Sequence, residues 1–337
     1  MNVRKLISFG KNSYIISLPK QWVDKNKLSK GDLLSLEENK EGLLLKINSN
    51  EAAKEEPKTM VINAENKSLT LLKTEIVSAY LDNYNVIEVI SRDLQSNAPE
   101  ISAILQNLAG LEIINQTSTR IVAKDLINVK EISILDLIRR MDNITRAMSE
   151  DTSTCFEDAG HVGSLHNIDE DVNRLHFLAY RVIRSGLKDV RIANSLGKNA
   201  LNLHSDHTVT EQIERIADNT KRICKYLKYT KLGERWRLEL KKLFDDIKQS
   251  YFDVMKSYYT NDPNIALHIE EKNKELIKIC DAFFDKHNHR GLKFGNGDKK
   301  GVCNFRWACG ATAKIIENMK QMAYSVKYIA RTVIGGG

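Results

Sequence analysis

The sequence is poor in residues that interrupt helices or crosslink chains. Only four prolines occur in 337 residues, which leaves room for long helices and argues against a sandwich of many short strands joined by proline-rich turns. The five cysteines are odd in number, and no two of them form a Cys-x-x-Cys motif. Neither a disulfide framework nor a zinc ribbon is therefore expected, and we predict reduced thiols in a cytoplasmic protein.

Long apolar runs and the local signatures of catalysis are also missing. No apolar run approaches the roughly 18 residues of a membrane span, and none of signal-peptide length follows Arg4 and Lys5, so we expect no membrane insertion. Between residues 59 and 128 the only glycine is Gly110, which leaves no glycine-rich phosphate loop. Neither Gly-x-Ser-x-Gly nor His-Glu-x-x-His occurs. We expect a protein that is not an enzyme and has no organic cofactor.

The residues that are present favour a folded protein with a basic amino-terminal end. Hydrophobic residues make up 42% and charged residues 28% of the chain, and the net charge is +7. Residues 1–30 contain seven lysines and arginines against one acid, Asp24, so this short segment has a net charge of +6 and the remainder is nearly neutral. Such a basic end is typical of a segment that binds a polyanion, although a solvated lysine-rich surface has the same composition.

Three zones of different patterning follow one another along the chain. Short apolar runs at 14–18, 33–36 and 43–47 predict a small β unit, and the polar stretch 48–58 predicts a linker. The zone 59–128 predicts a small α/β sandwich with strands at 60–62, 86–90, 111–114 and 120–123 and helices at 69–81 and 99–108. From residue 132 onward a helical period predicts six long helices, which fit two antiparallel three-helix bundles. The predicted fold is multidomain and mainly α.

The first zone has the motif order of a known family of DNA-binding domains. A basic pair, Arg4-Lys5, is followed by Gly10-Lys11, by Ile16-Ser17-Leu18-Pro19 and by the turn Lys30-Gly31-Asp32. Over residues 3–48 this order resembles the swapped-hairpin AbrB/MazE/SpoVT family. The resemblance implies a DNA-binding and dimerisation domain at 1–49 that interlocks with a second copy, so that the protein is a homodimer.

The same resemblance implies which residues meet duplex DNA. The positions that match the family's basic residues are Arg4, Lys5 and Lys11. Relatives often place paired arginines at the short helix, where this chain has Trp22-Val23-Asp24; Lys20, Lys25 and Lys27 are then the expected further contacts. The alternative is that the hairpin serves only for dimerisation.

The helical zone contains two paired strings of polar residues. Asp-Val-Asn-Arg-Leu spans 171–175 and Glu-Arg-Ile-Ala-Asp spans 214–218, and together they resemble the signature of PhoU, the phosphate-uptake regulator, over residues 132–332. The resemblance implies a metal site in the first bundle and a weaker site in the second. The first would use Asp169, Asn173, Glu214 and Asp218, and the second would use Glu271, Glu275, Glu317 and Gln321.

Because Asn173 replaces the acid usual in the family, we expect a labile divalent ion in the first site. Magnesium or manganese fits best, and iron or zinc would need nearby histidines. The alternative is a solvated, salt-bridged helix face.

Residues 108–113 and 117–122 resemble the connecting domain of archaeal fusions between an AbrB-like head and a PhoU-like body. This domain is either a spacer or a small-ligand pocket. The order of the zones predicts a DNA-binding transcriptional regulator of phosphate uptake with a sensor body. The alternative is an adaptor that docks on a phosphate ABC transporter ATPase or a sensor kinase and uses the head only to dimerise.

Overall fold

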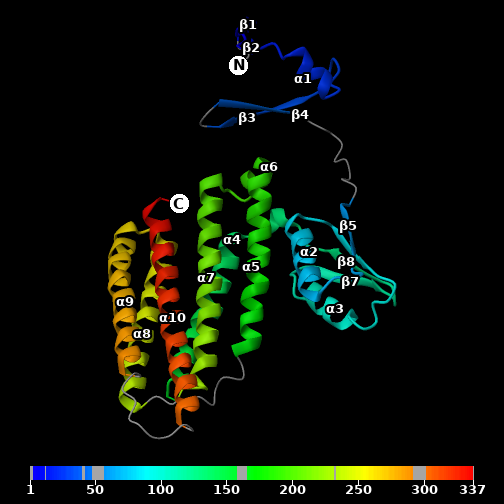
Figure 1. Ribbon diagram of the computed structural model, residues 1–337. Coiled ribbons are helices and arrows are strands. Elements are labelled where there is room, and N and C mark those ends of the chain that lie inside the picture. Colours follow the sequence, from blue (N-terminus) through cyan, green and yellow to red (C-terminus); the bar gives the residue numbers. More distant parts are fainter. Residues whose placement is uncertain are drawn as a thin grey trace. The chain divides into compact units, whose positions relative to one another are not determined.

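The structure is a computed structural model that describes residues 3–11, 13–39, 42–47, 57–157, 165–230, 233–290 and 301–336. The chain divides into two compact units, Met1–Glu56 and Pro57–Gly337 (Figure 1). We call the first unit the head. Within the second we distinguish an α/β part, residues 57–131, and a helical body, residues 132–336. Most of the predicted linker, residues 48–56, lies outside the described residues.

The head consists of two antiparallel hairpins and one short helix. Strands β1 (Ile7–Phe9) and β2 (Ser13–Ile15) pair with each other, as do β3 (Leu34–Asn39) and β4 (Gly42–Ile47), and α1 (Lys20–Lys25) lies between the hairpins in the chain. Gly10 has φ +69°, a left-handed conformation that suits glycine in the tight turn after β1. Pro19 precedes the first turn of α1, where no helical hydrogen bond is lost.

None of the side chains described in the head is buried. Large apolar residues that would form a core in a self-sufficient domain are instead exposed. They include Val3, Leu6, Ile7, Phe9, Tyr14, Ile15, Ile16, Leu33, Leu36 and Leu43. Two-stranded hairpins of this size bury too little apolar area to be stable alone, so the head as described has the surface of half a domain.

The α/β part is a four-stranded sheet covered on one face by two helices. The sheet order is β5-β6-β8-β7, with β5 parallel to β6 and the other neighbours antiparallel. The elements are β5 (Thr59–Asn63), α2 (Leu69–Leu81), β6 (Val86–Ile90), α3 (Ala98–Gln106), β7 (Leu111–Gln116) and β8 (Arg120–Asp125). Alternate strand residues such as Ile87 and Val89 face Leu72, Ile76 and Ile101 of the helices.

The helical body is built from two three-helix bundles that share one core. A short 3₁₀ turn, η1 (Val129–Glu131), leads into it. The elements are α4 (Ile134–Cys155), α5 (Leu165–Lys188), α6 (Val190–Ser195), α7 (Ala200–Leu227), α8 (Glu234–Thr260), α9 (Pro263–Arg290) and α10 (Gly301–Ile334). Helices α4, α5 and α7 pack together, α8, α9 and α10 pack together, and α7 lies along α10 between the bundles (Figure 1). The predicted fold class is therefore confirmed.

One buried ion pair fastens the α/β part to the helical body. Arg181 of α5 is 2% exposed, and its guanidinium donates two hydrogen bonds to the carboxylate of Asp125 and a third, of 2.7 Å, to Oδ1 of Asn83. The same guanidinium lies 4.5 Å from the centre of the Tyr80 ring. Phe177 and Tyr180 of α5 also pack against the core of the α/β part, so the two parts form one compact unit.

Candidate functional site

The six basic residues predicted to meet DNA are all on the surface of the head. Arg4 and Lys5 precede β1, Lys11 lies in the turn before β2, and Lys20, Lys25 and Lys27 lie on or next to α1. All six are exposed, and none forms an ion pair within the described part of the chain. These six exposed cations give the described part of the head a positive surface, a property that favours anionic partners in general.

The residues predicted for the first metal site come together from two helices. Asp169 and Asn173 lie on α5, Glu214 and Asp218 lie on α7, and Asn173 Nδ2 donates to Asp169 Oδ2 over 3.3 Å. Burial and then the negative charges of Asp218 and Asp169 raise the pKa of Glu214 to about 7. The spacing of four residues thus places these acids on facing helix surfaces.

Basic side chains of α7 already pair with two of these acids, Asp169 and Asp218. The ammonium of Lys221 pairs with the buried carboxylate of Asp169 and lies 3.8 Å from Asp218 Oδ1. Arg222 pairs with Asp218 at 2.5 Å. Across the described residues, no three acidic, histidine or cysteine side chains lie where they could share a metal ion. In this arrangement the residues do not fit a bound metal, and the metal site stays a prediction.

The residues predicted for the second site are solvent-facing. Glu271 and Glu275 of α9 and Glu317 of α10 are exposed. Gln321 Nε2 donates to Glu317 Oε1 over 2.8 Å, and Lys278 pairs with Glu275 at 2.8 Å. These pairs are those of a salt-bridged helix face, and this weaker site also stays a prediction.

A pocket of about 310 Å³ opens between the α/β part and the body, next to the first carboxylate pair. Its apolar wall comes from α2, α3 and α5, and its charged lining includes the Asp169–Lys221 pair, Lys73 and Arg174. Lys73 and Arg174 are exposed, and neither has an ion-pair partner among the described residues. The α/β part therefore lines a pocket in addition to packing against the helical body.

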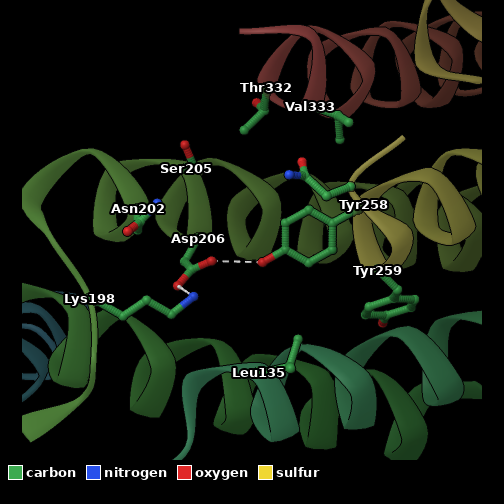
Figure 2. Close-up of a pocket in the computed structure, with 10 residues that line it drawn as sticks. Leu135, Lys198, Asn202, Ser205, Asp206, Tyr258, Tyr259, Thr332 and Val333 are labelled. Carbon is green, nitrogen blue, oxygen red and sulfur yellow. Dashed lines mark hydrogen bonds and ion pairs between the residues drawn. The ribbon is translucent and has the colours of Figure 1, made fainter. Parts of the chain in front are cut away.

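Two buried carboxylates in the body were not predicted from the sequence. Asp206 of α7 accepts a hydrogen bond of 2.7 Å from Tyr258, and Lys198 Nζ lies 3.0 Å from its second oxygen. This group lines a pocket of about 210 Å³ where the amino-terminal turns of α4 and α7 meet the last turns of α8 and α10. Figure 2 shows Tyr258 and Lys198 converging on the carboxylate of Asp206. Asp142 of α4 accepts hydrogen bonds from the hydroxyls of Tyr251 and Tyr259 and pairs with Arg146 at 2.9 Å. The only sequence signal was an aspartate on an otherwise apolar helix face.

Comparison with known proteins identifies the head most clearly. A family model described as "Antidote-toxin recognition MazE, bacterial antitoxin" matches residues 7–54, so the predicted MazE/AbrB-like domain at the amino terminus is confirmed. No curated protein matches the chain.

Among solved structures, PhoU from Pseudomonas aeruginosa matches with 11% identity and a TM-score of 0.43, covering 60% of this chain and 93% of that structure. A similarity of this size carries no conclusion about function. None of the helices among the described residues is long and apolar enough to cross a membrane.

Proposed function

We propose that the protein is a dimeric, non-enzymatic DNA-binding regulator of phosphate uptake, in which the head binds duplex DNA and the helical body receives the signal. The observation that supports this most strongly is the head itself. It matches the MazE model over residues 7–54. Its described residues combine six exposed cations with an exposed apolar surface and include no buried side chain. Positive charge supplies affinity for the DNA backbone, and the apolar surface supplies self-association.

The phosphate part of the proposal rests on the sequence resemblance to PhoU. Asp-Val-Asn-Arg-Leu at 171–175 and Glu-Arg-Ile-Ala-Asp at 214–218 lie on α5 and α7, on facing surfaces of the first bundle. A signal received there reaches the α/β part through α5, which is fastened to it by Arg181. An effect of about 1 to 3 kcal/mol on DNA binding is enough for regulation.

An electrophoretic mobility-shift assay with duplex DNA tests the first half of the proposal. In a dimer, Arg4→Ala/Lys5→Ala removes four phosphate contacts, so the slope of log affinity against log salt should become shallower by roughly 3 to 4. The control is Lys242→Ala/Lys256→Ala on α8, which removes the same charge from exposed lysines of the body. Equal salt slopes for the two double variants would rule out the assigned contacts.

The alternative function is an adaptor that docks on a phosphate transporter ATPase or a sensor kinase, with the head used only to dimerise. The exposed apolar surface of the head is compatible with this role as well. An adaptor has no salt-dependent affinity for duplex DNA. Selection of bound genomic fragments separates the alternatives further, because the regulator should enrich promoters of phosphate genes.

A further inference from the structure

Two buried cysteines from distant parts of the sequence meet in the first bundle. Cys155 is the last residue of α4, and Cys224 lies in the last turn of α7. Their exposed fractions are 3% and 0%, and the two Sγ atoms are 2.8 Å apart. Among the side chains that the structure describes, one further cysteine is buried, Cys280 of α9 in the other bundle. Two buried thiols at this distance can react with each other, whereas a single buried thiol only fills space in the core.

The packing around the pair holds both backbones in place. Cys155 and Cys224 belong to the common core of the helical body. Phe156, next to Cys155, is 1% exposed, and its ring centre lies 5.4 Å from that of Phe244. A disulfide has a sulfur–sulfur bond of about 2.05 Å, so the two atoms need to approach by less than about 1 Å. We infer that Cys155 and Cys224 are a site of reversible oxidation, at which a peroxide converts the two thiols into one intramolecular disulfide.

The chemistry balances with a small peroxide as the oxidant. One sulfur attacks a peroxide oxygen, the O–O bond breaks, and a sulfenic acid and one water are formed. The second sulfur then attacks the sulfenic sulfur, the S–S bond forms as the S–O bond breaks, and the second water leaves. Two thiols lose two hydrogens and two electrons, and one hydrogen peroxide is reduced to two waters. A thiol reductant reverses the oxidation by disulfide exchange.

The environment makes this site selective and slow. The hydrogen bond with Cys155 and then burial raise the pKa of Cys224, which keeps the reactive thiolate rare at neutral pH. As the oxidant of this pair, a small peroxide that can enter the packed core is favoured over a bulky disulfide compound. Once formed, the bond closes a loop from α4 to α7 that contains α5 and α6. A loop of this length should raise the Tm of the body by roughly 10 °C.

Peptide mapping of the full-length protein tests the inference. The folded protein is treated with hydrogen peroxide at neutral pH, the remaining thiols are alkylated in denaturant, and the protein is digested without reductant. We expect a mass loss of about 2 Da from two hydrogens and a linked peptide that contains Cys155 and Cys224. The link and the rise in Tm should both disappear after treatment with dithiothreitol.

Variants show whether the pair acts alone. Cys155→Ala and Cys224→Ala should each lose the linked peptide, and Cys280→Ala should keep it. If an alanine variant does not fold, the wild-type map decides by itself. Alkylation of both cysteines after peroxide treatment, oxidation to sulfinic acid without a link, or a link to any other cysteine would overturn the inference.

Discussion

The ammonium of Lys221 lies among the acids of the predicted first metal site, where a bound ion would otherwise supply the positive charge. Its ammonium pairs with the buried Asp169 and lies near Asp218, so the positive charge that a divalent ion would supply is provided by the chain. The amide of Asn173 adds a donor to Asp169 where the family resemblance implies an acid. The balance between an internal ammonium and an external ion is thus set by one side chain.

Replacing Lys221 should shift this balance toward metal. In Lys221→Met the buried carboxylate of Asp169 loses its cation, while Asp218 keeps its pair with Arg222, so we expect affinity for Mn²⁺ to rise by roughly 10- to 100-fold over the wild type. Titration calorimetry with manganese chloride measures this change. Adding Asp218→Asn should abolish most of the gain, whereas adding Gln321→Ala should not.

Lys225→Met is the matched control, because Lys225 is an exposed lysine of the same helix one turn further on. It should leave manganese affinity at the wild-type level. If Lys221→Met also binds manganese no better than the wild type, the acids of α5 and α7 form only a salt-bridged helix face.

Between elements, the contact of α5 with the α/β part includes one buried ion pair, Arg181 with Asp125. Arg181→Met leaves the carboxylate of Asp125 buried without a partner, and the expected loss is about 3 to 5 kcal/mol in the free energy of unfolding. Urea denaturation followed by circular dichroism measures it. Hydrogen exchange should increase most in β8 and α2, which flank the lost contact.

Two further variants separate the ion pair from general damage. Arg181→Met/Asp125→Leu removes both charges and should recover a large part of the loss. Arg215 of α7 pairs with Glu211, and its side chain is 56% exposed. Arg215→Ala should therefore lower the free energy of unfolding by at most about 1 kcal/mol. Equal destabilisation by Arg181→Met and Arg215→Ala would contradict the assigned role.

Periodicity was sufficient to predict most elements and insufficient to predict how they are joined. The helix predicted at 69–81 is α2 with the same bounds, and the strand predicted at 86–90 is β6, because apolar spacing is a local property. Arg181 finds its partner 56 residues away and Lys221 finds Asp169 52 residues away. Such pairs depend on how helices are placed in space. The one sequence signal for Arg181 is that it is a charged residue among the apolar residues of α5.

For the whole molecule, the head predicts the oligomeric state. Its exposed apolar residues include Phe9 at 64% and Leu43 at 71%, and we expect a second copy of the same hairpins to cover them. We expect light scattering at micromolar concentration to give twice the mass of one chain. Phe9→Asp/Leu43→Asp should halve that mass without reducing the helical circular dichroism signal of the body.

Leu201→Asp provides the control for charge on an exposed apolar position. Leu201 is 72% exposed in the first turn of α7, and this variant should remain dimeric. A monomeric wild type would rule out the predicted dimer, and a dimer that survives both head substitutions would place the contact between copies outside the head.

The packing of α7 along α10 determines how such a chain can be divided. Ile216 and Ile223 of α7 and Met319, Met322 and Val326 of α10 are 0% exposed and belong to one continuous core. A chain that ended after α7 would expose the apolar face of α7 to water. The head forms a separate compact unit with no buried side chain among those described. A gene fusion that exchanges the head for another module should therefore leave the body folded, whereas a break between its two bundles should not.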